Sequence, residues 1–347
     1  MINLQSDVVN TPTKEMWNAM SKARTGWVID REDPSVNELE EKAAKKMGKE
    51  SALFVLTGRM AILVALMTLA RRGHQIILEK DSHIVWGEEW GLSFICGLYP
   101  RLIKGSFGIM NPLEIENAIN ESKFKHKPVT DLVCIENTHN MAGGTVIDLK
   151  QTEAISEISH KYGAKVFLDG ARIFHAAIAL NITAAELVKP CDMVMFSLVK
   201  GLSAPGGALL CGTEKDISEA YINLSRIGAN SFHKLGILAS AGIVALENMV
   251  DRLSEDQLKA KIFAKKISSI ENIKVDLERV QTNIVMADIS KTAFTSDQFL
   301  NLLKKEEIYA HKFTDKIVRF TFHREITESD IEKVISIIKE IIRKGNA

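Results

Sequence analysis

Short apolar runs alternate with amphipathic stretches over the first two thirds of the chain. Five of these runs have the length and composition of buried strands, and they lie at 51–56, 75–80, 132–137, 165–170 and 193–198. The residues between them have the apolar spacing of helices, as in 113–124 and 152–163. A further helix is expected to begin at Ser35, because Ser35 and Glu38 follow Pro34 with the spacing of a capping box. Strands that alternate with helices in this way predict a mostly parallel sheet with helices on both faces.

The last third of the chain has a different rhythm. The run GGALLCG, at 206–212, follows the preceding strand too closely for a helical crossover, so we expect an antiparallel strand there. A long helical region is expected at about 233–270. Beyond it, NIKVDL, TNIVMADI and KIVRFTF look like strands, and helices are expected near 296–305 and 327–343.

The sequence therefore predicts an α/β protein of two packed domains. The first is a large domain over residues 1–250, which includes an N-terminal arm. The second is a smaller α/β domain over residues 251–347.

Composition and charge exclude several classes of partner. The 347 residues include 44 Lys and Arg against 44 Asp and Glu, so the formal net charge is zero. Without excess positive charge to neutralise phosphates, no nucleic-acid partner is expected. No run reaches the roughly 18 apolar residues of a membrane span, and the N-terminus MINLQSDVVN is too polar for a signal peptide. The four cysteines form no CxxC pair, so we expect reduced thiols, a cytoplasmic location and no membrane partner.

Polar residues follow the predicted parallel strands, where ligands of open α/β sheets bind. The turn around Gly58 follows the first strand and opens a helix, whose N-terminal N–H groups and dipole favour an anion. His83 follows the second strand, Asp169 ends the fourth and Lys200 follows the fifth. Taken singly, each has a plain explanation: a helix cap for Asp169, a loop histidine for His83, a solvated lysine for Lys200.

Together these residues match what pyridoxal phosphate demands. Its phosphate needs a helix N-terminus, its pyridine nitrogen a carboxylate, its aldehyde a lysine, and its ring a planar side chain such as histidine. The separation of Asp169 and Lys200, 200 − 169 = 31 residues, leaves room for a helical crossover. Metal binding lacks support, since no HExxH or close histidine pair is present, and we expect no metal. A Ser-His-Asp hydrolase would need a GxSxG elbow, which is absent.

Five segments match those of one known family in order: LQSDVVNTPTKEMWNAM, EDPSVNELE, IENTHNMAGG, FLDGARIFHAA and KGLSAPGGALLCG. With them the chain resembles the threonine aldolases, of the low-specificity and L-allo-threonine type, within the β-eliminating lyase group. The similarity runs from about residue 3 to about residue 250. It implies the aspartate-aminotransferase fold (fold type I): a large pyridoxal-phosphate-binding domain with a mostly parallel, seven-stranded sheet covered by helices, and a smaller C-terminal α/β domain.

The resemblance also implies catalytic roles. Lys200 resembles the Schiff-base lysine, and Asp169 the carboxylate beside the pyridine nitrogen. His83 resembles the histidine that stacks on the cofactor ring near the substrate hydroxyl. His126 matches the second active-site histidine, which reaches the substrate side chain.

Three further residues are expected at the substrate α-carboxylate by the same resemblance. Ser6 resembles the serine that helps to hold that group, and Arg319 is placed like the arginine of the small domain that clamps it. Arg172 resembles a contact to the substrate carboxylate or the cofactor. A bidentate arginine would fix the Cα bonds relative to the ring and so decide which bond breaks.

The chain departs from the family pattern around the phosphate. Thr57-Gly58-Arg59 replaces Ser-Gly-Thr at the phosphate turn, Val199 replaces a serine, and His233 stands where the family has an arginine. The segment Val28–Arg31 lacks the family's tyrosine. We expect Thr57, Gly58 and Arg59 to bind the phosphate, with Arg59 compensating for the lost arginine.

The resemblance implies retro-aldol cleavage of a β-hydroxy-α-amino acid, such as L-threonine or L-allo-threonine, to glycine and an aldehyde. Two alternatives stay open: β-elimination, racemisation or transamination of another amino acid on the same cofactor, and a non-catalytic relative. The family also implies a homotetramer, a dimer of dimers, with an amino acid as substrate.

Overall fold

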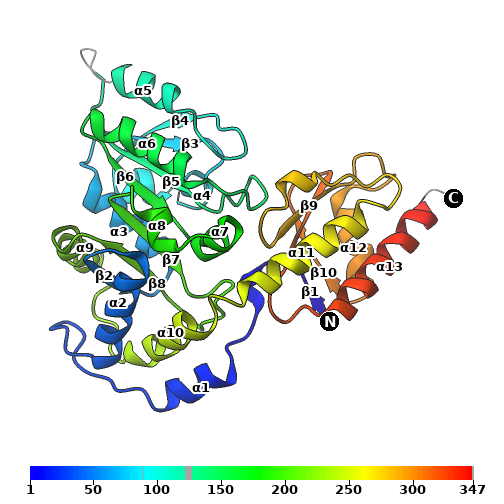
Figure 1. Cartoon of the computed structure of the whole chain (residues 1–347), viewed down its shortest axis with the longest axis horizontal. Helices are drawn as coiled ribbons and strands as arrows, with labels where there is room; N and C mark the ends of the chain where they lie inside the picture. Colours follow the sequence, from blue (N-terminus) through cyan, green and yellow to red (C-terminus); the bar gives the residue numbers. More distant parts are fainter. Residues whose placement is uncertain (89, 122–126, 346–347) are drawn as a thin grey trace.

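The computed structural model describes residues 1–88, 90–121 and 127–345, and it has a large and a small lobe (Figure 1). Within the described residues, seven strands form the central sheet of the large lobe. Their order is β2 (Ser51–Val55), β8 (Ala208–Gly212), β7 (Met193–Ser197), β6 (Lys165–Asp169), β5 (Thr130–Glu136), β3 (Gln75–Glu79) and β4 (Tyr99–Ile103). The strands from β7 to β4 are parallel, whereas β8 is antiparallel to both of its neighbours. The predicted parallel sheet and its antiparallel addition are confirmed.

Alternate residues of these strands pack on opposite faces, as their pleat requires. Phe54 and Leu168 belong to one apolar core, and Leu53 and Phe167 belong to the other. Helices α2 (Pro34–Met47), α6 (Leu149–Lys161), α7 (Ile173–Leu180), α8 (Ala184–Val188) and α10 (Gly236–Asn248) supply the first core. Helices α3 (Gly58–Leu69) and α9 (Glu214–Arg226) supply the second. The continuous apolar runs in the sequence follow from this burial on both faces.

Several elements differ from the prediction. Helix α2 is capped by Asp33, whose carboxylate accepts the N–H groups of Ser35 and Val36 at 3.1 Å, so the expected Ser35 capping box is wrong. The reason is Pro34, which lacks an N–H and suits the first helical position. The helical region at 233–270 is broken between α10 and α11 (Leu253–Ile267). The edge strand β4 was not predicted, because its sequence YPRLI contains proline and is largely exposed.

The small lobe is built around an antiparallel sheet. Among the described residues, β9 (Ile284–Asp288), β12 (Ile317–Thr321) and β11 (His311–Lys312) form this sheet. Helices α11, α12 (Ser296–Lys305) and α13 (Glu328–Gly345) contribute to its core. The segment NIKVDL makes only an isolated bridge, from Lys274 to Asp288, instead of the expected strand. A small C-terminal sheet domain is therefore present, and its boundary at residue 250 stays a prediction.

The N-terminal arm joins the two lobes (Figure 1). Strand β1 (Ile2–Asn3) pairs in parallel with β10 (Ile308–Tyr309), and Ile2 and Leu4 are buried in the core of the small lobe. The chain then returns to the large lobe through α1 (Lys14–Ser21), which packs on α10. Residues 5–10 consequently pass between the lobes. No helix in the described ranges is both long enough and apolar enough for a membrane crossing.

Candidate active site

The carboxyl ends of β6 and β7 place a carboxylate and an amine at one edge of the sheet. Asp169, the last residue of β6, is buried, and its Oδ1 accepts the N–H of Ala171 at 3.1 Å. Its Oδ2 is also buried and has no hydrogen-bond partner in the described part of the chain. Because a buried carboxylate oxygen is costly without a donor, Asp169 is suited to a protonated ring nitrogen.

Lys200 follows β7 in the same region. Burial, together with the charge of Arg172, lowers the pKa of the Lys200 amine to about 8. The side chain of Asn10 fixes this turn, since its Nδ2 donates to the carbonyl of Lys200 at 3.0 Å. A larger fraction of the Lys200 amine is therefore unprotonated, and nucleophilic, near neutral pH than in an ordinary lysine.

The predicted anion turn lies at the start of α3. Thr57 caps the helix by accepting the N–H of Met60 at 3.1 Å, and Gly58 is the first helical residue. A Cβ on Gly58 would come within 3.1 Å of Met195, so the small residue permits close packing there. The side chain of Arg59 is 67% exposed, and its Nε lies 3.5 Å from Oε1 of Glu88. The helix N-terminus can hold a phosphate, with Arg59 at its rim.

His83 begins α4 (His83–Gly87) with a buried carboxylate beside its ring. Its Nε2 lies 3.7 Å from Oε1 of Glu88, an oxygen that has no hydrogen-bond partner in the described ranges. Burial raises the pKa of Glu88 to about 7, although Arg59 opposes this shift. Glu88 is not predictable from the sequence, because nothing in GEEW distinguishes it from a solvated acid.

Arg172 is held by Asp7 of the N-terminal arm. Nε and Nη2 of Arg172 each donate to one Asp7 oxygen at 2.7 Å, and both side chains are buried. Burial alone would raise the pKa of Asp7, but Arg172 outweighs it and holds that pKa far below its usual range. Asn283 also donates to the Asp7 carboxylate, at 3.1 Å. One edge of the Arg172 guanidinium is thus occupied by hydrogen bonds to Asp7. Asp7 was not among the site residues predicted from the sequence.

Arg319 reaches this region from β12 of the small lobe. Its Nη1 donates to Oδ1 of Asn140 at 3.1 Å, and Arg172 Nη1 lies 3.5 Å from the same oxygen. The Nε of Arg319 is buried without a hydrogen-bond partner among the described residues. Burial and then the charge of Arg172 lower the pKa of Arg319 to about 10. Two guanidinium groups lie close together, and the buried Nε of Arg319 has no partner among the described residues, so they suit a carboxylate ligand.

Of the remaining two predicted substrate contacts, Ser6 lies within the described residues. Ser6 caps the short 3-10 turn Asp7–Val9, accepting the N–H of Val8 and donating to Asp7, both at 3.4 Å. It therefore lies beside the Asp7–Arg172 pair, and its contact with the substrate carboxylate stays a prediction. His126 lies outside the described residues.

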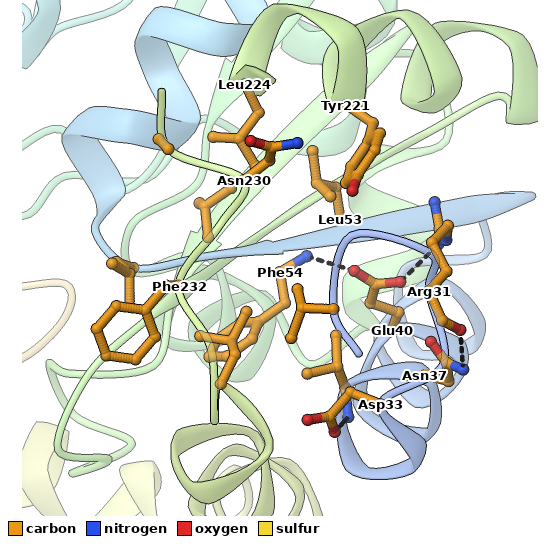
Figure 2. A pocket seen from close by; sticks show the side chains of 16 residues that line it. Arg31, Asp33, Asn37, Glu40, Leu53, Phe54, Tyr221, Leu224, Asn230 and Phe232 are labelled. Carbon is orange, nitrogen blue, oxygen red and sulfur yellow. Dashed lines mark hydrogen bonds and ion pairs between the residues drawn. The ribbon is translucent and has the colours of Figure 1, made fainter. Parts of the chain in front are cut away.

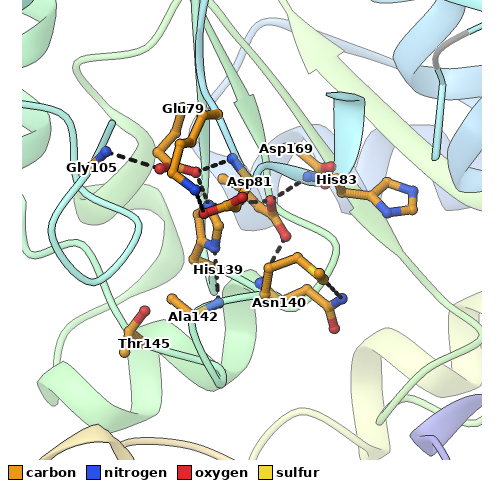
Figure 3. A network of polar contacts seen from close by, with 12 residues as sticks. Glu79, Asp81, His83, Gly105, His139, Asn140, Ala142, Thr145 and Asp169 are labelled. Carbon is orange, nitrogen blue, oxygen red and sulfur yellow. Dashed lines mark hydrogen bonds and ion pairs between the residues drawn. The ribbon is translucent and has the colours of Figure 1, made fainter. Parts of the chain in front are cut away.

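A buried network of polar contacts around His139 lies near His83 and Asn140 (Figure 3). Nε2 of His139 is 3.1 Å from Oε2 of Glu79 and 3.8 Å from Oε2 of Glu136, and all three side chains are almost fully buried. Burial disfavours the charged imidazole, but Glu136 and Glu79 outweigh it and raise the pKa of His139. The network joins the ends of β3 and β5 and supports the loops that carry His83 and Asn140.

The two segments that depart from the family pattern meet each other. The ring of Trp27 stacks on His233, with centroids 5.1 Å apart. Next to them, residues 28–40 and 221–235 line a cavity of about 30 Å³, together with β2 (Figure 2). Glu40 lies in its wall, accepting hydrogen bonds from Arg31 at 2.6 Å and from the N–H of Phe54 at 2.9 Å. The segments around Val28–Arg31 and His233, which both depart from the family pattern, are thus in contact with each other.

Comparisons with known proteins agree on one family. A family model described as β-eliminating lyase matches residues 3–292. Low-specificity L-threonine aldolase 1 of Arabidopsis thaliana is 34% identical over 98% of this chain and 96% of its own length. The low specificity L-threonine aldolase of Escherichia coli K12 is 30% identical over 96% and 97%. The solved structure of Leishmania major threonine aldolase superposes with a TM-score of 0.83 at 18% identity, covering 99% of this chain and all of the other. That structure supports the fold.

Proposed function

Because the chain belongs to the β-eliminating lyase family, whose members depend on pyridoxal phosphate, we propose that it is an aldolase of the threonine type. It cleaves the Cα–Cβ bond of a β-hydroxy-α-amino acid and releases glycine and an aldehyde. The observation that carries this proposal is the group at the sheet edge: the unpartnered Oδ2 of Asp169, the Lys200 amine and the paired guanidinium groups of Arg172 and Arg319.

These residues fit the cofactor. The orphaned Asp169 oxygen would hold the proton of the pyridine nitrogen, the start of α3 would hold the phosphate, and Lys200 would bind the aldehyde carbon. When bound, pyridoxal phosphate supplies an electron sink for the pair released at Cα.

The protein's own contribution is orientation and proton transfer. Arg319, with the open edge of Arg172, would receive the substrate α-carboxylate and so align the Cα–Cβ bond with the ring. His83 would take the proton of the β-hydroxyl, and this kind of base catalysis contributes about 10²–10⁴ in rate. Glu88, 3.7 Å from His83 Nε2, would stabilise the imidazolium that forms. His126 is assigned to the same end of the substrate by resemblance alone.

The test is product analysis. The purified protein, loaded with pyridoxal phosphate, is incubated with L-threonine and with L-allo-threonine, and acetaldehyde and glycine are counted in parallel. Equal amounts of the two products support the proposal and reveal the stereochemical preference. Ammonia with a keto acid would indicate β-elimination, and a D-amino acid would indicate racemisation; either result without glycine overturns it. A protein that binds the cofactor and releases nothing would be a non-catalytic relative.

We also propose that the chain forms a homotetramer in the cytoplasm. Large apolar side chains are exposed on one segment of the large lobe: Trp86 at 58%, Trp90 at 85% and Phe94 at 86%. A second copy covering them would remove this apolar surface from water. All four cysteines lie in the described ranges, buried and unpaired, which fits a reducing compartment. Sedimentation analysis at micromolar concentration tests the assembly, and a monomer would contradict it.

A further inference from the structure

One buried carboxylate touches the loops of both functional groups that would face the substrate. Glu136 is the last residue of β5 and only 5% exposed. Its Oε2 accepts the N–H of His83 at 2.7 Å, and its Oε1 accepts the N–H of Asn140 at 2.8 Å. Both loops are therefore tied to a single strand end (Figure 3).

On the other side, Asn140 connects Glu136 to two arginines. The side chain of Asn140 presents Oδ1 to Nη1 of Arg319 at 3.1 Å and to Nη1 of Arg172 at 3.5 Å. These two arginines come from different lobes, and Asn140 is a polar contact that they share. A displacement of its backbone N–H would consequently move the acceptor that both guanidinium groups use.

Glu136 contacts the backbone of the proposed base, His83, directly. The N–H that Glu136 accepts belongs to the first residue of α4, whose imidazole is the proposed base. A helix has no internal acceptor for its first N–H groups, so Glu136 supplies one and fixes where α4 begins. The ring of His83 projects from that fixed point toward Glu88.

We propose that Glu136 is a positioning residue that sets the separation between the His83 base and the arginine pair. This inference rests on the proposed function, in which His83 serves the β-hydroxyl and the arginines serve the α-carboxylate. One rigid group thereby matches the protein to the distance between the two ends of its substrate. Small errors in such a distance are costly to a reaction that depends on bond alignment.

The network behind Glu136 keeps its carboxylate in place. His139 stands between Glu136 and Glu79, and its Nδ1 accepts the N–H of Ala142 at 3.2 Å. Glu79 is equally buried, but its oxygens accept the N–H groups of Asp81 at 2.6 Å and Gly105 at 2.9 Å. Glu79 thus offers a matched control: the same residue type and the same network, without a bond to His83 or Asn140.

The experiment compares Glu136→Gln with Glu79→Gln in the full-length protein loaded with pyridoxal phosphate. Glycine carries the carboxylate but no hydroxyl, and its binding is followed by the absorption spectrum of the cofactor. A glutamine in place of Glu136 can accept from only one of the two N–H groups. We expect the glycine dissociation constant to rise about tenfold and kcat/KM for threonine to fall about 10- to 100-fold. Glu79→Gln should lower the melting temperature and change both constants clearly less than Glu136→Gln does, because Glu79 reaches Glu136 only through His139.

Glycine binding and turnover in Glu136→Gln equal to the wild type would overturn the inference, as would equal losses in both variants. If Glu136→Gln does not fold, Asn140→Ala replaces it, because that variant removes the shared Oδ1 and keeps Glu136. It should weaken glycine binding and lower kcat/KM for threonine, and unchanged glycine binding would again overturn the inference. If the wild-type protein binds glycine but releases no aldehyde from threonine, the proposed function is wrong. Glycine titration of Glu136→Gln would then still show whether Glu136 positions the arginine pair.

Discussion

The carboxylate of Asp7 receives two hydrogen bonds from Arg172, each 2.7 Å long, across 165 positions of sequence. Asp7 belongs to the arm that pairs with the small lobe, and Arg172 precedes α7 in the large lobe. This buried pair therefore ties the arm to the active site. Its carboxylate also offsets part of the positive charge that Arg172, Arg319 and Lys200 bring to this region.

Asp7→Asn should be strongly destabilising. The change leaves the buried Arg172 charge without its carboxylate, and removing one partner of a buried pair costs about 3–5 kcal/mol. Denaturant unfolding at pH 7 measures the loss. The exposed ion pair of Asp315 with Lys312 supplies the control, because Asp315→Asn should change the free energy of unfolding by less than about 1 kcal/mol.

The pH dependence of this difference follows from the direction of the pKa shift. The pKa of Asp7 is lowered on folding, so its stabilisation is present above the ordinary aspartate pKa and is lost as the pH falls below it. The difference in free energy of unfolding between wild type and Asp7→Asn should consequently be constant from pH 6 to 8 and smaller in acid. Equal stability of the two proteins at pH 7 would contradict the pairing.

Glu40→Gln should become more stable relative to wild type as the pH rises. Burial raises the pKa of Glu40 to about 7, although Arg31 opposes it, so between pH 4.5 and 7 the folded state binds more protons than the unfolded state. Wild-type stability therefore falls through this range, by on the order of 3 kcal/mol, whereas the glutamine side chain of the variant does not titrate. Thermal unfolding at pH 5 and pH 8 checks this.

The exposed Glu247, which pairs with Lys42, is the control for Glu40. The stability of Glu247→Gln should differ from that of wild type by the same small amount at pH 5 and at pH 8. A stability difference between wild type and Glu40→Gln that does not change with pH would show that the Glu40 carboxyl titrates normally.

Lys200→Ala should abolish both turnover and covalent capture of the cofactor. Borohydride should fix pyridoxal phosphate on the wild-type chain and leave the variant unlabelled, which intact mass spectrometry detects. We expect a fall in kcat of at least about 10³-fold. Lys304→Ala, at an exposed position of α12, should behave as wild type. Labelling of the Lys200→Ala chain at another lysine would move the assignment elsewhere.

The sequence revealed the residues at strand ends and missed those that act through distant partners. Asp169 and Lys200 could be found because each follows an apolar run that predicts a buried parallel strand. Asp7 could not, because an acid held by an arginine far away in sequence looks like any surface acid. Glu136 lies at the end of a predicted strand, 132–137, but its role depends on the N–H groups that it accepts from two loops, and the strand pattern does not show those contacts. The same limit applies to Glu88, whose burial depends on the fold around α4.

Local patterns failed where a stronger local rule or an edge position intervened. Ser35 had the spacing of a cap, but Pro34 moved the cap to Asp33. Strand β4 lies at the sheet edge, where Pro100 and Arg101 are tolerated and no apolar alternation is needed. The continuous helix expected at 233–270 ends at Asn248, since the pattern did not show the break before α11.

Arg59 should contribute to cofactor affinity through its charge at the rim of the phosphate turn. It occupies the second position of α3, beside the helix N-terminus, and its side chain is mostly exposed. Loss of an exposed cation near a dianionic phosphate weakens binding modestly, so Arg59→Ala should raise the dissociation constant of pyridoxal phosphate about 3- to 10-fold, and more at low salt. Arg101→Ala, which removes an exposed arginine paired with Glu121, should leave that constant unchanged.

A double variant, Glu88→Gln with Arg59→Ala, separates the two contacts of Arg59. If Arg59 served only to neutralise Glu88, the double variant would bind the cofactor like the wild type. If Arg59 contacts the phosphate, the double variant should bind the cofactor as weakly as Arg59→Ala.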